Sequence, residues 1–248
     1  MNILLLNPNM TVAMTEAMTR VASHVVGPGT VLKPVTAQTG FPYISSRAEA
    51  QVAGAIALDL IAQHQAEVDA VVIAAFGDPG LLAARELFDL PVVGMAEAAM
   101  TSALLLGQRF AFVTFTRHMR PWYEQSVQQA GLQSRFAGVR TPEAGFQSVA
   151  TVQDELFDAL RGLVQQAVDD DGADVVVLAG APLAGLAYRY TDAPAVLVDP
   201  ISAAVTQAEA LARLAPRGAH AGSFARPPGK PNTGLPAALS ARIERRTD

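Results

Sequence analysis

Amide and hydroxyl side chains gather where the first predicted strand gives way to the first predicted helix. The segment Asn-Pro-Asn-Met-Thr places Asn7, Asn9 and Thr11 on this turn. Together with the free backbone N–H groups of a helix N-terminus, such side chains can bind a carboxylate or a ureide. They could also act as a helix N-cap, although two asparagines around a proline exceed what a cap needs. Thr114 and Thr116 lie on the corresponding turn in the second half of the chain.

A second candidate turn, which follows another predicted strand, contains Phe76, Gly77, Asp78 and Gly80. Its two glycines would let the backbone approach a ligand closely, so that N–H groups could form a pocket for an oxyanion. The same segment is also typical of a tight turn in which Asp78 caps the following helix. In the second half, Ala181 and Pro182 form the matching loop, which offers fewer donors because proline has no N–H.

Groups that could transfer a proton are few. The sequence has no cysteine and four histidines, which excludes disulfides, thiolate metal sites and thiol catalysis. The candidate acids and bases are the tyrosines, a loop histidine and three carboxylates, namely His118, Asp78, Glu97 and Asp199. A lone loop histidine is more often solvated or structural, and Glu97 and Asp199 could equally be helix caps after equivalent strands. No two histidines have a ligand-like spacing, so we expect neither a metal site nor a cofactor.

The elements that must position these residues follow a regular alternation. Short apolar runs, rich in Val, Ile and Leu, predict strands that are buried on both faces. These runs are Ile3–Leu6, Val71–Ala75, Pro91–Met95, Phe110–Thr114, Val175–Leu178 and Pro194–Val198. Segments with a 3.6-residue spacing predict helices over Met10–Val26, Ala48–Gln63, Gly80–Leu87, Arg120–Ala130, Val152–Asp169 and Ile201–Leu214. Strands that alternate with helices indicate βαβ units and a parallel sheet.

The two halves of the chain also match each other. The run from Asp69 to Ala75 resembles the run from Asp174 to Gly180. Each run is followed by a turn that contains Gly and Pro, then by a short helix and by a strand that begins with proline. Such a repeat indicates a duplicated lobe.

The repeat predicts an α/β fold of two similar lobes, each a parallel sheet flanked by helices. We expect residues 1–106, completed by 207–248, to form the first lobe and residues 107–206 to form the second. Ligands bind at the carboxyl ends of the strands in open sheets of this kind. Ala75 and Gly180 lie at equivalent strand ends, so they should face each other across an active-site cleft between the lobes.

Several segments resemble the hydantoin and allantoin racemase branch of the aspartate/glutamate racemase superfamily. They are residues 7–11 (Asn-Pro-Asn-Met-Thr), 43–50 (Tyr-Ile-Ser-Ser-Arg-Ala-Glu-Ala), 76–81 (Phe-Gly-Asp-Pro-Gly-Leu), 91–99 (Pro-Val-Val-Gly-Met-Ala-Glu-Ala-Ala) and 198–204 (Val-Asp-Pro-Ile-Ser-Ala-Ala). The resemblance implies two catalytic cysteines, one from each lobe, that remove and return an α-proton. At those positions this chain has Ala75 and Gly180. The related arylmalonate decarboxylases keep only the second cysteine, which this chain also lacks.

The resemblance also implies that Tyr43 and Arg47 belong to a substrate-covering segment. Arg47 could pair with a carboxylate there, or it could be a surface residue at a helix start. Alanine and glycine neither accept nor deliver a proton, and a general acid or base typically contributes about 10²–10⁴-fold to a rate. A thiol-based racemisation is therefore not expected.

We expect an enzyme that acts without thiols on a small hydantoin-like ureide or carboxylate. The resemblance implies an isomerase. The missing cysteines favour a lyase or hydrolase step instead, in which the pocket stabilises an enolate-like or oxyanion intermediate. The alternative is a small-molecule binding protein that has kept the cleft and lost the chemistry.

Composition limits the other classes of function. The chain of 248 residues is half apolar and carries a net charge of −5, so binding to nucleic acid is not expected. Its apolar residues form no stretch of about 20 that predicts a transmembrane helix, and its start is typical of a strand rather than of a signal peptide. We expect a cytoplasmic protein. The irregular tail from Pro216 should pack on a neighbouring subunit of a homo-oligomer.

Overall fold

The computed structural model describes residues 1–214, 217 and 220–245. Its strands are β1 (Asn2–Asn7), β2 (Val31–Thr36), β3 (Ala70–Ile73), β4 (Val92–Gly94), β5 (Phe110–Val113), β6 (Phe136–Arg140), β7 (Val175–Leu178) and β8 (Val196–Val198). Its α-helices are α1 (Val12–Ser23), α2 (Arg47–His64), α3 (Leu81–Leu87), α4 (Met95–Leu106), α5 (Arg120–Gln129), α6 (Val152–Glu155), α7 (Phe157–Asp169), α8 (Pro200–Leu214) and α9 (Ala237–Ile243). Short 3-10 helices lie at Gln65–Glu67, Arg117–Met119, Gln133–Arg135, Ala181–Leu183, Leu186–Tyr188 and Gly222–Phe224. Within the described ranges, no helix has the length and apolar character needed to cross a membrane.

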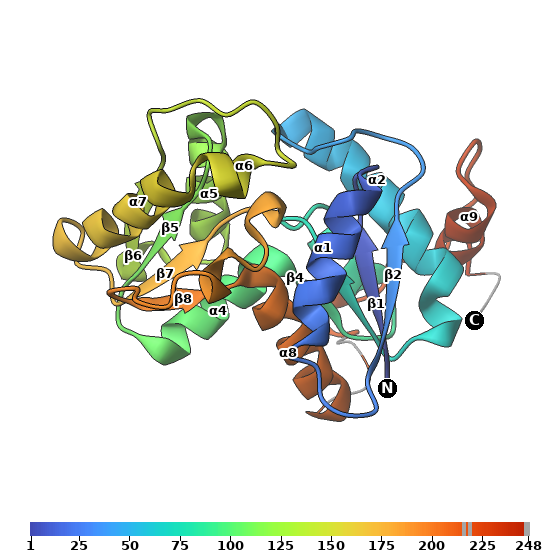
Figure 1. Ribbon diagram of the computed structural model, residues 1–248. Helices are drawn as coiled ribbons and strands as arrows, with labels where there is room; N and C mark the ends of the chain where they lie inside the picture. The colour runs from blue at the N-terminus through green and yellow to red at the C-terminus, as the bar shows by residue number, and fades with distance from the viewer. Residues whose placement is uncertain (215–216, 218–219, 246–248) are drawn as a thin grey trace.

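The strands form two sheets of four, one in each lobe (Figure 1). The strand order is β2-β1-β3-β4 in the first sheet and β6-β5-β7-β8 in the second. All neighbouring strands run parallel. The same order in both sheets confirms the predicted α/β fold of two similar lobes.

Both faces of each sheet are covered by apolar side chains. In β1, Ile3 and Leu5 belong to a core that continues between the lobes, whereas Leu4 and Leu6 pack with residues of α2 and α3. Neighbouring residues of a strand point to opposite faces, so burial of both faces requires apolar residues at every position. This requirement explains why the strands appear in the sequence as unbroken apolar runs.

Two strands, β2 and β6, lie where no strand was predicted. Each is at an edge of its sheet. β2 contains Lys33 and Pro34, and β6 contains Gly138 at a φ of +135° beside a register shift in its pairing with β5. Charged residues, proline and irregular pairing are tolerated at sheet edges, and they remove the apolar pattern. α4 also lies where no helix was predicted, because most of its residues are apolar and no 3.6-residue spacing stands out.

The helix that follows the last strand of each sheet packs on the other sheet. α4 follows β4 but contacts β5, β7 and β8 of the second sheet, and α8 follows β8 but contacts β1, β3 and β4 of the first. The two helices also contact each other between the lobes (Figure 1), where the Gln207 side chain donates to the Ala98 carbonyl over 2.9 Å. Each sheet is therefore completed by a helix from the opposite half of the chain. The lobe boundaries at residues 106 and 206 stay a prediction.

The described part of the C-terminal tail packs on the first lobe of its own chain. α9 contacts α2, and the buried Arg242 guanidinium donates to the Leu87 carbonyl over 2.9 Å and to the Asp89 carboxylate over 2.7 Å. The expected packing of the tail on a neighbouring subunit stays a prediction. Pro216, where the predicted tail begins, lies outside the described residues, and the homo-oligomer stays a prediction.

Glu209 provides a test of how α8 is held on the first lobe. Its side chain is buried, and its carboxylate accepts hydrogen bonds from the Gly27 N–H at 3.1 Å and from the Thr30 hydroxyl. Glu209→Ala leaves these donors unpaired, so it should lower the free energy of unfolding by about 1–3 kcal/mol in urea denaturation. Glu16→Ala, which removes an exposed glutamate of α1, is the control. Equal unfolding midpoints for the two variants would contradict the role of Glu209.

Candidate active site

The end of β3 is lined by small apolar side chains. Ala75 is buried in a cluster with Ile44, Ala50 and Ala53, and Trp122 packs against this cluster. Ile44 lies just before α2, the two other alanines lie in α2, and Trp122 comes from α5 of the second lobe. None of these side chains is a general acid or base. The Ala75 side of the site is therefore an apolar wall.

The end of β7 has a different character. Gly180 has a φ of +122°, a conformation that residues with a side chain rarely adopt. A Cβ atom at Gly180 would lie 3.0 Å from Cε1 of Phe115 and 3.5 Å from the hydroxyl oxygen of Tyr123. The place where the resemblance puts a thiol is therefore bordered by an aromatic ring edge and a phenol.

The Tyr123 phenol is buried beside Thr114. Burial raises the pKa of Tyr123 well above 10, and the nearby Tyr43 adds to this effect. Thr114 is fully buried, and its hydroxyl makes no hydrogen bond of normal geometry with any described residue, although it is close enough to Tyr123 to lower the pKa of that phenol slightly. A phenol with a raised pKa stays protonated at neutral pH. Tyr123 is therefore present as the protonated phenol.

α5 joins the two sides of the site. Trp122 and Tyr123 are neighbours on this helix; the first packs against the cluster around Ala75, and the second lies beside Gly180. Phe76, the residue after Ala75, packs edge-on against Tyr123 with ring centroids 4.8 Å apart. The two predicted strand ends thus meet at one place between the lobes.

Backbone donors remain available in the turn after β3. The N–H groups of Ala75, Phe76 and Gly77 donate to none of the described residues. Successive free N–H groups of this kind suit the stabilisation of an oxyanion. The turn therefore retains the donors that the sequence predicts for a ligand.

Gly77 and Gly80, the two glycines of this turn, lie in close contact with neighbouring helices. A Cβ atom at Gly77 would lie 2.5 Å from Cζ2 of Trp122, and one at Gly80 would lie 3.0 Å from the backbone of Gly54 in α2. Glycine is needed at these positions because a helix from each lobe packs directly on the turn. The expectation that they also give a ligand close access to the backbone stays a prediction.

Asn7, Asn9 and Thr11 hold the turn after β1 together. Nδ2 of Asn7 donates to Oδ1 of Asn9 and to Oγ1 of Thr15, both over 2.9 Å, and Oδ1 of Asn7 accepts the Asn9 N–H. Nδ2 of Asn9 makes only a weak contact of 3.4 Å with a methionine sulfur. The donors of Asn7 are therefore engaged within the protein, whereas Asn9 keeps an amide hydrogen for a ligand. The binding roles of the three residues stay predictions.

The candidate carboxylates have structural partners. Asp78 accepts the N–H groups of Ala96 and Glu97, each at 2.8 Å. It therefore caps α4, whereas the sequence predicted a cap on the helix that directly follows the turn, α3. Asp199 caps α8 in the equivalent way. The Glu97 carboxylate is paired with Arg85. The catalytic roles predicted for Asp78 and Glu97 remain untested, and these partners do not favour them.

Some of the remaining candidate residues lie at the surface, and others lie near the buried site. His118 is exposed on its 3-10 helix and makes no hydrogen bond or ion pair with the described residues, while Thr116 just before it is partly buried. Arg47 is exposed and donates to α5 of the second lobe. Tyr43 lies nearer the site, with its ring 6.1 Å from that of Phe115, and burial raises its pKa.

A cavity of about 420 Å³ lies between the lobes next to these residues. Thr11 and Met14 line it from the first lobe, and Ala181, Pro182 and Gln153 line it from the second. Ala181 directly follows Gly180, so the cavity reaches the loop at the end of β7. The structure thereby brings together Thr11, Ala181 and Pro182, three of the predicted binding residues.

Comparison with known proteins identifies the family. The family model described as Asp/Glu/Hydantoin racemase matches residues 3–208. The chain belongs to this family. A hydantoin racemase of Paenarthrobacter aurescens is 33% identical over 230 residues, which cover 92% of this chain and 98% of that protein.

Solved structures agree with this family assignment. An allantoin racemase from Klebsiella pneumoniae has a TM-score of 0.90 at 32% identity, and the match covers 96% of this chain and 98% of that one. An allantoin racemase from Pseudomonas fluorescens has a TM-score of 0.86 at 30% identity, covering 94% of this chain and 100% of that one. All three relatives are named racemases, which supports an enzyme of the isomerase class. The resemblance inferred from the sequence is confirmed.

Three aromatic residues of the site were not singled out from the sequence of this family member. Tyr123 was considered only among the tyrosines as a group, and Phe115 and Trp122 were not considered. Trp122 and Tyr123 lie outside the predicted turns, whereas Phe115 lies within one of them, between Thr114 and Thr116. The sequence did contain one pattern that could have identified Trp122 and Tyr123. They are adjacent in α5, a helix whose other residues are mostly polar. Two aromatic residues side by side on such a helix indicate a face that is buried against another element.

Gly180→Cys should not rebuild the second thiol of the family. A side chain at this φ costs about 1–3 kcal/mol, and the Phe115 ring must move to make space. We expect Gly180→Cys to lower the free energy of unfolding in urea. Ala75→Cys is the matched control, because alanine already has a Cβ atom and should tolerate the change better. Wild-type stability of Gly180→Cys would contradict this expectation.

Asp78 should make stability depend on pH. Burial raises the pKa of Asp78 to about 7, against the lowering effect of its two N–H donors. The folded protein then holds this proton more tightly than the unfolded chain, so stability is greatest in acid and falls as the pH rises from about 4 to 7. Asp78→Asn does not titrate. The difference in free energy of unfolding between the two proteins should change across this range, and a constant difference would contradict the shift.

Proposed function

We propose that this protein is a thiol-independent lyase of the Asp/Glu/Hydantoin racemase family, acting on a small carboxylate or a hydantoin-like ureide. The supporting observation is the asymmetry of the site, with a protonated phenol beside Gly180 and an apolar wall at Ala75. A two-base racemisation needs a proton-transfer group on each side of the substrate. One group that only donates suits a reaction that adds a proton from a single face.

The proposed reaction is the loss of carbon dioxide from a carbon next to a carbonyl group. The C–C bond to the carboxylate breaks, and its electron pair moves into the carbonyl to give an enolate. The Tyr123 hydroxyl then transfers its proton to that carbon, so a C–H bond forms as the O–H bond breaks. The resulting phenolate takes a proton from water, which completes the cycle.

Binding of the intermediate would fall to the polar groups around the strand ends. The N–H groups of Ala75, Phe76 and Gly77 would stabilise the enolate oxygen. The free hydroxyl of Thr114 and the amide of Asn9 would orient the rest of the substrate. In a buried site, these neutral donors act strongly on a developing negative charge.

A hydrolase step has less support. It requires a base that activates water, and the carboxylates of Asp78, Asp199 and Glu97 are held by helix N–H groups or by Arg85. The rival from another class is a binding protein without catalysis. The apolar wall at Ala75 and the exposed position of His118 favour that rival.

Proton NMR in D₂O distinguishes these functions. The enzyme would be incubated with carboxylated hydantoins, allantoin, thiohydantoins, maleate-type acids and amino acids. We expect loss of a carboxyl group and a product that carries one deuterium on a single face. Exchange of an α-proton at rates typical of racemases would overturn the proposal. Binding of a compound without turnover would support the non-catalytic rival. We further propose, from the sequence alone, a cytoplasmic homo-oligomer that needs no cofactor.

Tyr123→Phe should lower turnover by about 10²–10⁴-fold, because it removes the proposed proton donor and little else. Binding of the substrate should change much less. Tyr190→Phe is the matched control, since the phenol of this buried tyrosine donates to the Phe157 carbonyl in the second lobe. Iodoacetamide should leave the activity unchanged. Full turnover by Tyr123→Phe would exclude the phenol as the donor.

A further inference from the structure

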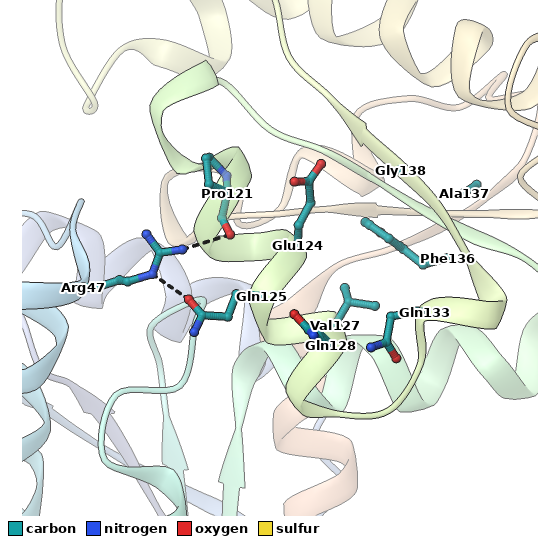
Figure 2. A pocket seen from close by; sticks show the side chains of 10 residues that line it. All are labelled: Arg47, Pro121, Glu124, Gln125, Val127, Gln128, Gln133, Phe136, Ala137 and Gly138. Atoms are coloured by element: carbon teal, nitrogen blue, oxygen red, sulfur yellow. Dashed lines mark hydrogen bonds between the residues drawn. The ribbon is translucent and has the colours of Figure 1, made fainter.

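Arg47 forms a direct hydrogen-bonded link between the two lobes. From the first turn of α2, its Nε donates to Oε1 of Gln125 over 2.6 Å and its guanidinium NH₂ donates to the Pro121 carbonyl over 3.1 Å. Both acceptors belong to α5 of the second lobe (Figure 2). We call these three residues the clasp.

The clasp is bordered by open space. A cavity of about 690 Å³ on one side is lined by Arg47, Gln125 and other residues of α5 and β6 (Figure 2). A second cavity, of about 430 Å³, is lined by the same two residues together with Gly77 and Trp122. The side chain of Arg47 therefore borders two cavities. Its hydrogen bonds can break without disruption of a packed core.

The helix that the clasp holds carries the aromatic residues of the site. Trp122 lies between the two acceptors of Arg47 and packs over Gly77 and the Ala75 cluster. Tyr123 is the next residue and lies beside Gly180. A shift of α5 away from α2 would move both rings, and so would change the position of the phenol relative to the strand ends.

The buried state of the site requires some opening. Thr114 is fully buried and Tyr123 is 1% exposed, so a substrate reaches them only after the lobes separate. On the other side of the molecule, α4 and α8 contact each other and each packs on the opposite sheet. That side can act as a hinge, whereas the side of the clasp can open.

We infer that Arg47 is a positioning residue, which closes the lobes over the substrate by holding α5 and so sets the Tyr123 phenol beside Gly180. The part that concerns Tyr123 rests on the proposed function. The part that concerns closure does not, because the contacts between Arg47 and α5 exist without substrate. Arg47 acts through α5 and does not touch the reacting atoms.

The experiment uses Trp122, the only tryptophan in the sequence, as a reporter. Acrylamide quenching of its fluorescence would be compared in the wild type, Arg47→Met and Arg120→Met. Arg120 is the matched control because it lies on α5 itself and pairs with Glu124 in the same helix. We expect the quenching constant to rise about twofold or more in Arg47→Met, because the open population grows, and to stay at the wild-type value in Arg120→Met.

A third variant tests the clasp in the opposite direction. Gln125→Glu gives Arg47 a charged acceptor, and hydrogen bonds between charged groups are stronger. Its quenching constant should fall below that of the wild type. If Arg47 had only a structural role, Arg47→Met would lower the thermal unfolding midpoint and Gln125→Glu would not change the quenching constant. Equal quenching in all four proteins, or an equal rise in both methionine variants, would overturn the inference.

Turnover measurements separate this inference from the proposed function. If both hold, Arg47→Met lowers kcat, whereas Arg120→Met does not. If the proposed chemistry is wrong, Tyr123→Phe keeps full turnover while the quenching differences persist. If Arg47 does not hold the lobes closed, Tyr123→Phe loses turnover and Arg47→Met has the same quenching constant as Arg120→Met.

Discussion

The exchange of α4 and α8 between the sheets is the constraint on which the rest of the structure depends. Each sheet buries both faces, and one of its covering helices comes from the other half of the chain. The lobes therefore cannot separate fully without exposing apolar surface, which is costly in water. They remain joined along α4 and α8, and the ends of β3 and β7 stay close to each other on the side where α5 meets α2. Relative motion is thus limited to opening on that side.

The same exchange explains why two acidic residues near the site have structural partners. An exchanged helix leaves N–H groups without intrahelical partners at its start, and Asp78 and Asp199 satisfy those groups at the starts of α4 and α8. Asp78 lies in the turn that also carries Ala75. One turn therefore fixes a helix of the opposite lobe with its side chain and keeps free N–H groups on its backbone. The buried phenol of Tyr123, by contrast, lies beside Gly180 and caps none of the described helices.

Most of the fold was predictable because it depends on local patterns. Six of the eight strands among the described residues appear as apolar runs, and the repeat places Ala75 and Gly180 at equivalent ends. The edge strands β2 and β6 were missed because solvent permits Pro34 and a bulge at Gly138 there. The site was less predictable. Its polar turns were recognised, but the aromatic side that α5 supplies depends on packing between lobes, which no local pattern records.

The surroundings of Gly180 leave little space for a side chain at this strand end. Here the backbone at Gly180 has a φ of +122°, Phe115 lies at contact distance from the missing Cβ, and the Tyr123 hydroxyl is beside it. Glycine adopts this conformation readily, whereas a residue with a side chain would be strained there. The rings of Phe115 and Tyr123 therefore border the space that a side chain at residue 180 would enter, and a cysteine there would require Phe115 to move.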